Sequence, residues 1–272
     1  MERKPFAKSN FLILGTAKDV ASTIVSEVER LTELFSNSAS VTWLIIESDS
    51  SDDTLVRLHE LEKYPNFFWH SLGKLAIDHP RRTERLALCR NFYLSLIESS
   101  HEYSNIDYVV VSDLDGVNSG LTLSGIQSCW ELDDNWDACF ANQHAPYYDV
   151  WALRHDQLCA GDCWEDYRTL VSGGLKSQDA MFAAVWSRMV EIDPSEKAIE
   201  VDSAFGGFGI YKKDIVRFGR YVGVNQEGFE VCEHVAYHLG LRARGAKLFI
   251  NPRLINGGWN EHSDRLKSYL GL

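Results

Sequence analysis

The chain alternates between short hydrophobic runs and longer segments in which apolar residues recur at helical spacing. The runs "FLIL" (11–14), "WLII" (43–46) and "YVVV" (108–111) contain no charged residue. Such continuous runs are typical of strands that are buried on both faces. A fourth, shorter strand is predicted in "NFFWHSL". Apolar residues every three or four positions predict helices over 19–36, 55–64 and 83–99.

The order strand, helix, strand, helix, strand, helix, strand indicates an α/β fold. Because the strands are continuously apolar, we expect an open, mostly parallel, Rossmann-type sheet with helices on both faces. Ligands of such sheets bind beyond the carboxyl ends of the strands. Two acidic turns, 47–53 and 113–115, are predicted to lie at that edge.

The second half of the chain is less regular. It predicts a strand over 137–144 and helices over 178–190 and 231–244. The stretches "APYYDVWALRHD" and "CAGDCWEDY" between them predict long loops with edge strands. "AFGGFGIYKKD" indicates a glycine-rich turn that enters a strand, and "AKLFINP" indicates a last strand that stops at Pro252.

Charge and composition restrict the class of function. The 272 residues are 45% hydrophobic and carry a formal net charge of −12, which argues against nucleic-acid binding. The N-terminal apolar run is too short for a signal or membrane segment, so we expect a cytoplasmic protein without an integral membrane segment. Peripheral membrane association is left open. The six cysteines are then expected to be reduced thiols.

Two aspartates follow the "YVVV" strand directly, in "SDLDG". Side chains alternate along an extended chain, so Asp113 and Asp115 are expected on the same side. Two carboxylates directed at one point repel each other unless a cation lies between them, and their oxygens suit Mg²⁺ or Mn²⁺. The alternative is a solvated turn in which each aspartate hydrogen-bonds locally.

The second strand also ends in acids, in "IIESDSSDDT". Glu47 could accept hydrogen bonds from the edge of a nucleotide base, and Asp49 could reach base or ribose. The alternative is an acidic turn in which Asp52 or Asp53 caps the following helix. Both interpretations can hold together.

Arginines precede and follow the start of the third predicted helix, in "RRTERLALCRN". Arg85 and Arg90 are candidates for contacts with a diphosphate near the helix N-terminus. They do not share one face of the helix, so we expect only one of them to point at a ligand.

"IIESDSSDDT", "ERLALCRN", "VVVSDLDG" and "CEHVAYHLGLRARGAKLFINP" occur in an order that resembles GT-A-type glycosyltransferases. Within these, "YYDVWALR" and "RLALCRN" look most similar to the capsule-associated α-1,3-mannosyltransferase family and its bacterial relatives. The resemblance implies one GT-A domain over 1–272, with a nucleotide-binding half (1–117) and an acceptor and catalytic half (118–272). It also implies a GDP-mannose donor and retention at the anomeric carbon.

The resemblance further implies roles for individual residues. Asp115 would bind the metal, and Asp113 would contact the metal through water or would contact the ribose. His262 follows Glu233 by 29 positions, within the range where these enzymes place a metal-binding histidine. Glu233 and Glu230 are the candidate catalytic carboxylates near the sugar or the acceptor hydroxyl.

Several further residues have two interpretations. The pair His234 and His238, four residues apart on a predicted helix, could bind a metal or simply pack. Tyr148 and Trp151, with their neighbours in "YYDVWALR", could form a wall for the sugar or belong to the core. The glycines of "FGGFG" (205–209) could line the donor sugar or form a plain tight turn.

The expected reaction is metal-dependent transfer of a sugar from a GDP- or UDP-sugar to a hydroxyl of a saccharide or glycolipid, in polysaccharide biosynthesis. A sugar-phosphate nucleotidyltransferase is one alternative, although it would need a richer Gly and Arg content in the first turn. A non-catalytic sugar-binding module is the other.

Overall fold

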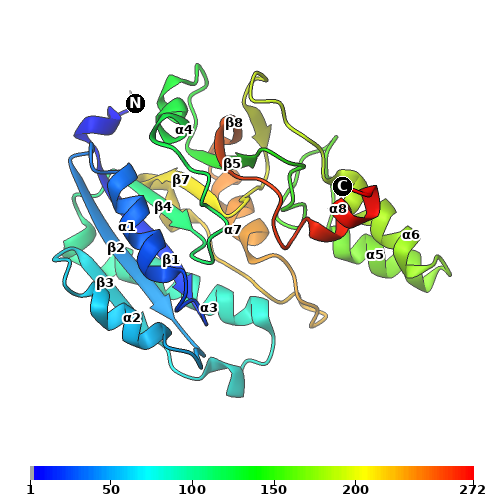
Figure 1. Cartoon of the computed structure of the whole chain (residues 1–272), viewed down its shortest axis with the longest axis horizontal. Coiled ribbons are helices and arrows are strands. Elements are labelled where there is room, and N and C mark those ends of the chain that lie inside the picture. Colours follow the sequence, from blue (N-terminus) through cyan, green and yellow to red (C-terminus); the bar gives the residue numbers. More distant parts are fainter. Residues whose placement is uncertain (1–2) are drawn as a thin grey trace.

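The computed structural model describes residues 3–272, and its centre is one eight-stranded sheet (Figure 1). The strand order is β3-β2-β1-β4-β7-β5-β8-β6. The strands are β1 (Asn10–Ala17), β2 (Ser40–Glu47), β3 (Phe67–Ser71), β4 (Tyr108–Ser112), β5 (Ala138–Gln143), β6 (Ile199–Val201), β7 (Phe208–Lys212) and β8 (Leu248–Gly257).

The sheet is mixed but mostly parallel. β1 pairs in parallel with β2 and β4, β2 with β3, and β5 with β8. Only β7 and β6 run against their neighbours. This confirms the predicted α/β class and places the carboxyl ends of β1, β2 and β4 at one edge, as parallel neighbours require.

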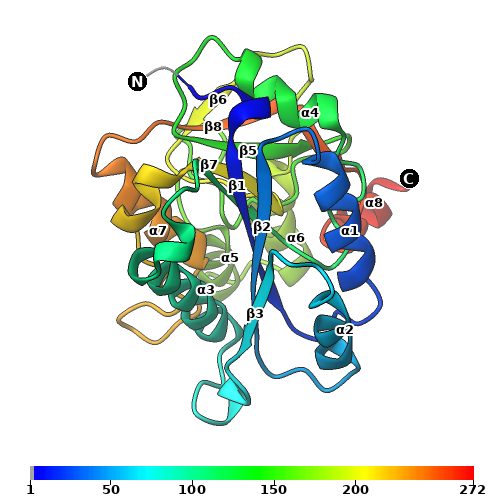
Figure 2. The same cartoon turned by 90° about the vertical axis from the view of Figure 1, so that its left-hand side faces the viewer.

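Helices cover both faces of the sheet (Figures 1 and 2). Successive residues of β1 serve opposite faces: Phe11 and Ile13 pack with α1, α2 and α4, whereas Leu12 and Leu14 pack with α3 and α7. The helices are α1 (Ile24–Leu34), α2 (Thr54–Leu61), α3 (Arg82–Ser99), α4 (Leu123–Gln127), α5 (Cys163–Ser172), α6 (Ser177–Ala184), α7 (Glu233–Arg242) and α8 (Asp264–Leu270). The strands with continuous apolar runs are therefore buried on both faces, as the sequence indicates.

Helices α5, α6 and α8 form a separate group at one end of the molecule (Figure 1). They share a small core in which Cys163, Ala184 and Leu266 are buried. The prediction of loops and edge strands for "CAGDCWEDY" is wrong here, because α5 begins at Cys163. Its start is capped by Asp162, whose carboxylate accepts hydrogen bonds from the backbone N–H groups of Trp164 and Glu165. The helix predicted over 178–190 ends earlier than expected, at Ala184.

Strand β8 continues beyond Pro252, so the predicted stop at that residue is wrong. The pairing with β5 changes register between Phe140 and Asn142, and Pro252 lies opposite this irregularity. Proline is tolerated there because a bulge requires no ladder hydrogen bond from its nitrogen. The Pro252 carbonyl instead accepts a hydrogen bond from the Asn142 side chain. As a result β8 carries the chain on to Gly257, near the sheet edge where β4 also ends.

All six cysteines are free, in agreement with the expected reduced thiols, and the fold buries all of them. Among the described residues, no helix has the length and apolar character needed to cross a membrane.

Candidate functional site

A cavity of about 1020 Å³ opens beyond the carboxyl ends of β1, β2 and β4. This is the edge at which open α/β sheets bind ligands. Most of the predicted site residues line it: Arg85, Arg90, Asp113, Asp115, Glu230, Glu233 and His262. The cavity therefore brings together residues that lie up to 177 positions apart in the sequence (Arg85 to His262).

A buried arginine holds two of the predicted carboxylates. Arg90 on α3 is 3% exposed. Its Nε lies 3.1 Å from Glu233 Oε1, and its Nη2 lies 3.5 Å from Asp113 Oδ1. Phe205 and Tyr221 enclose the guanidinium, with ring centroids 5.4 and 5.7 Å away. Pairing and cation–π contacts offset the cost of burying this charge.

Negative charge exceeds positive charge around this arginine. Burial raises the pKa of Asp113 to about 7; Arg90 opposes this rise, while the charges of Asp115, Asp149 and Glu233 add to it. Burial also raises the pKa of Asp149, although its carboxylate accepts a hydrogen bond from the Gly206 N–H at 2.9 Å. Such an excess of carboxylates favours the binding of a cation close by.

Asp115 meets His262 and Glu261 at the mouth of the cavity. One potential ligand atom from each residue lies within 4.8 Å of the other two, and all three side chains are exposed. The His262 ring stacks on Tyr148, with centroids 5.1 Å apart at an interplanar angle of 21°. Two carboxylate oxygens and one imidazole nitrogen suit a divalent cation such as Mn²⁺. The residues present therefore fit the metal that the sequence predicts.

The two aspartates after β4 do not act as a matched pair. Asp115 lies with Glu261 and His262, whereas Asp113 turns toward Arg90. The metal or ribose contact predicted for Asp113 stays a prediction.

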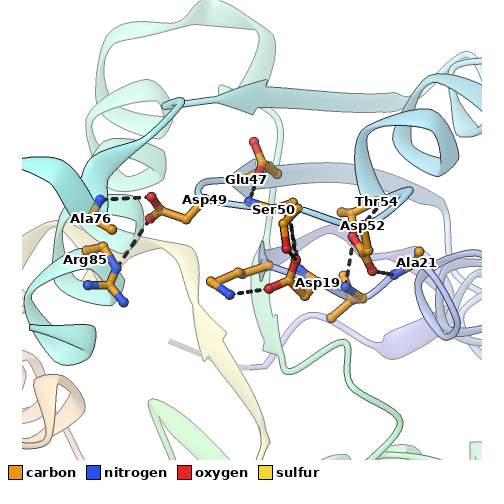
Figure 3. A network of polar contacts seen from close by, with 12 residues as sticks. Asp19, Ala21, Glu47, Asp49, Ser50, Asp52, Thr54, Ala76 and Arg85 are labelled. Carbon is orange, nitrogen blue, oxygen red and sulfur yellow. Dashed lines mark hydrogen bonds and ion pairs between the residues drawn. The ribbon is translucent and has the colours of Figure 1, made fainter. Parts of the chain in front are cut away.

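The turn after β2 is held by its own acids (Figure 3). Glu47 is 2% exposed and accepts hydrogen bonds from the Ser50 N–H and the Ser71 hydroxyl. Asp49 has φ +64° and accepts a hydrogen bond from the Ala76 N–H at 2.9 Å. Of these described residues, neither Glu47 nor Asp49 lines the cavity, but Ser48 between them does. Base and ribose contacts from Glu47 and Asp49 stay predictions.

The turn also contacts two neighbouring segments (Figure 3). Asp52 accepts hydrogen bonds from the N–H groups of Ala21 and of Thr54, the first residue of α2. Asp53, at the N-cap position, makes no side-chain cap hydrogen bond. Asp49 Oδ2 lies 3.4 Å from Arg85 Nε. Arg85 and Arg90 both line the cavity, and the expectation that only one of them points at a ligand stays a prediction.

Glu230, in the loop that precedes α7, contacts the N-terminus of α3. Its carboxylate accepts a hydrogen bond from the Thr83 N–H at 3.1 Å and lies 3.2 Å from the Thr83 hydroxyl oxygen. Glu230 is exposed and Glu233 is 5% exposed, so Glu230 is the more accessible of the two candidate catalytic carboxylates. Their catalytic roles stay predictions.

The two histidines of α7 differ in their surroundings. His238 is fully buried between the Ser203 and Tyr211 hydroxyls, each 2.9 Å from a ring nitrogen. Burial, reinforced by Arg90, lowers its pKa to about 3. His234 stacks on Phe205, lines the cavity, and has no hydrogen-bond partner for either ring nitrogen among the described residues. Burial lowers its pKa well below the usual range.

The "YYDVW" and "FGGFG" segments meet beside the cavity. Tyr148, Asp149 and Trp151 line it, whereas Tyr147 is buried in the core. Gly207 has φ +87°, and a Cβ there would approach the Tyr148 hydroxyl to 2.9 Å. A glycine is therefore required for this close packing.

The predicted site omits several lining residues. Glu261 directly precedes His262, but in an exposed "NEH" stretch nothing in the sequence marks it as a partner of Asp115. Trp164, Tyr167 and Arg168 also line the cavity from α5. The sequence could have indicated them only if α5 had been recognised as a helix, because its position in space depends on packing with α6 and α8.

No protein-family model matches the chain, and no curated protein matches it. Solved structures do. TarS 1-349 of S. aureus has 11% identity and a TM-score of 0.50, over 89% of this chain and 57% of that one. The same protein in complex with UDP-GlcNAc has 11% identity and a TM-score of 0.50, over 93% and 59%. Mannosyltransferase PcManGT from Pyrobaculum calidifontis, in complex with GDP-Man and Mn²⁺, has 12% identity and a TM-score of 0.49, over 92% and 56%.

The likeness to the two TarS structures shows the fold, which is the GT-A-type α/β fold that the resemblance predicts. The chain spans between 56% and 59% of the length of these three solved chains.

Proposed function

We propose that the chain is a divalent-metal-dependent glycosyltransferase. It transfers a sugar from a nucleoside-diphosphate sugar, with a GDP or UDP donor, to a hydroxyl of a saccharide or glycolipid. Mannose is the first candidate for the sugar, because of the motifs shared with the capsule-associated family. Polysaccharide biosynthesis and a cytoplasmic location are part of the same proposal.

One observation carries this proposal: Asp115, Glu261 and His262 converge at the mouth of a large cavity beyond the sheet's carboxyl edge. The three residues come from two segments that are separated by 146 positions (115 to 261). Their convergence at the ligand edge of this fold is the arrangement that a metal–diphosphate complex requires.

Asp115, Glu261 and His262 would hold the cation. When bound, the metal would neutralise the negative charge that develops on the leaving diphosphate. Arg90 fixes Glu233 and Asp113 at the cavity wall through its two ion pairs. Fixed carboxylates of this kind can orient sugar hydroxyls without reorganisation during the reaction. Glu230, the accessible carboxylate beside the start of α3, would accept a hydrogen bond from an acceptor hydroxyl.

The nucleotide would lie against the ends of β1 and β2. Thr16, Ala17, Lys18 and Ser48 line this part of the cavity. The Lys18 ammonium group pairs with Asp19, so one positively charged side chain would lie beside the ribose and phosphates.

A product assay separates this function from its alternatives. With Mn²⁺ and a GDP-mannose, UDP-glucose or UDP-GlcNAc donor, a glycosyltransferase releases GDP or UDP, and chelation or Asp115→Ala stops the release. A nucleotidyltransferase instead releases pyrophosphate from a nucleoside triphosphate and a sugar 1-phosphate. A sugar-binding module releases neither, and that result would refute the proposal.

A further inference from the structure

Five lysine and arginine side chains of the described residues line the cavity, and they fall into two groups. Lys18 pairs with Asp19, Arg85 with Asp49, and Arg90 with Glu233 and Asp113. The other two are Arg82 and Arg168. Within residues 3–272, neither of these two guanidiniums has an ion-pair partner or a side-chain hydrogen bond, and both are exposed.

Arg168 is held in place by an aromatic side chain. Its guanidinium carbon lies 5.1 Å from the centroid of the Phe229 ring, a distance typical of a cation–π contact. Phe229 is itself 50% exposed, at the end of a tight turn in which Asn225 Oδ1 accepts hydrogen bonds from the N–H groups of Glu227 and Phe229. The contact orients the cation but leaves its N–H donors free.

Two aromatic side chains of α5, Trp164 and Tyr167, line the cavity together with Arg168, and these three residues are called the α5 wall. The Trp164 and Tyr167 rings meet edge to face, with centroids 5.8 Å apart. The Tyr167 hydroxyl is 2.9 Å from the Ser177 hydroxyl at the start of α6, which fixes the ring. Rigid aromatic surfaces with a nearby polar group are common in sites for small polar ligands.

The α5 wall lies away from the nucleotide end of the cavity. Figure 1 shows α5 with α6 and α8 at one end of the molecule, and α1 and α2 at the other. Asp115, Glu261 and His262, from the loops after β4 and β8, form the cavity mouth. A ligand group at Arg168 would therefore belong to the acceptor.

We propose that the α5 wall is a subsite for an anionic saccharide acceptor, in which Trp164 and Tyr167 pack against the sugar and Arg168, with Arg82, binds a carboxylate or phosphate. This proposal rests on the glycosyltransferase function proposed above. An unpaired guanidinium at the rim of an otherwise acidic cavity binds an oxyanion more strongly than a neutral competitor. It also holds the anion apart from the carboxylates that surround Arg90.

The test measures binding of three probes by calorimetry, with and without Mn²⁺ and GDP or UDP. Methyl glucuronide carries a carboxylate, glucose 6-phosphate carries a phosphate, and methyl glucoside is neutral. At least one anionic probe should bind about tenfold or more tightly than the neutral probe. The preferred probe identifies the anion, and the preference should shrink at high salt.

Arg168→Gln should abolish this preference. Arg265→Gln is the matched control, because Arg265 is exposed on α8 and is not among the described residues that line the cavity. Equal binding of all three probes, no saturable binding of either anion, or an unchanged preference in Arg168→Gln would overturn the proposal. So would a loss of nucleotide binding in Arg168→Gln equal to its loss of probe binding, since Arg168 would then serve the donor.

Donor hydrolysis is measured separately on the same proteins. If the wild-type chain fails to release nucleotide from any donor, the glycosyltransferase proposal fails on that result, whichever probe binds. If release persists and the anion preference is absent, only the acceptor subsite fails.

Discussion

Burial and hydrogen-bond partners distinguish the carboxylates that hold the fold from those that are exposed at the cavity. Glu47 and Asp49 are engaged by backbone N–H groups in the turn after β2, whereas Asp115 and Glu261 are exposed at the cavity mouth. The sequence predicts that acids gather at the strand ends, because strand boundaries are visible in it. It cannot predict which acids turn inward, because that depends on neighbours such as Ser71 and Ala76 from other segments.

Substitution of Glu47 tests whether this carboxylate stabilises the turn after β2 or contacts a nucleotide. Glu47→Gln replaces a buried charged acceptor of two hydrogen bonds, so we expect the free energy of unfolding to fall by about 1–3 kcal/mol. Denaturant unfolding measures this loss, and titration of nucleotide into the folded variant measures any change in nucleotide affinity. Weakened nucleotide binding with unchanged stability would instead show that Glu47 contacts the base itself.

His238 predicts a pH dependence of stability. Its pKa is lowered to about 3 in the folded chain because burial opposes protonation, so the unfolded chain binds a proton that the folded chain does not. Stability is then fully present above about pH 6.5, the pKa of an unperturbed histidine, and is lost as pH falls toward 3. Between pH 7.5 and 5.5 this residue should account for a loss of about 1 kcal/mol.

Unfolding measurements at the two pH values on the wild type and His238→Gln test this. The variant should lose less stability on acidification than the wild type, whatever its stability at pH 7.5. Identical losses in both proteins would mean that His238 is not responsible.

At the scale of elements, the sheet and its first three helices follow from sequence periodicity, whereas the second half needs tertiary information. The sequence predicts that β8 stops at Pro252, yet this proline lies opposite a register change in β5 that no local pattern indicates. Aromatic and acidic residues interrupt the apolar periodicity of helix α5, so the helix depends on packing around Cys163 and Leu266. The α5 side of the cavity was therefore the least predictable part of the site.

The loop between β7 and α7 depends on close contact with α3. A Cβ at Gly223 would overlap the backbone of Thr83, whose hydroxyl donates a hydrogen bond to the Gly223 carbonyl. Gly223→Ala should therefore push the loop from α3 and displace Glu230. We expect a loss of about 1–3 kcal/mol in stability, as for other overpacked sites, together with slower sugar transfer.

Gly161→Ala is the control for this substitution, because a Cβ at Gly161 meets no atom within 4 Å. Thermal unfolding and donor turnover of the two variants provide the comparison. If Gly223→Ala resembles Gly161→Ala in both measurements, the loop does not need its close approach to α3.

At the scale of the whole molecule, one sheet brings together segments from both halves of the chain. β4 delivers Asp113 and Asp115, and β8 delivers Glu261 and His262 to the same cavity mouth, although two antiparallel pairings with β7 and the strand β5 lie between them. Under the proposed function, a cation bound by these acids would reverse the local charge and let this acidic protein bind an anionic donor.

The most direct test of this account is calorimetric titration of GDP and UDP into the wild-type chain with Mn²⁺, with a chelator, and with Asp115→Ala. Asp133→Ala, an exposed acid away from the cavity, is the control. The account predicts saturable binding of one nucleotide with Mn²⁺, at least about tenfold weaker binding with chelator or in Asp115→Ala, and no change in Asp133→Ala. Equal affinity of the wild type with Mn²⁺ and with chelator would contradict it.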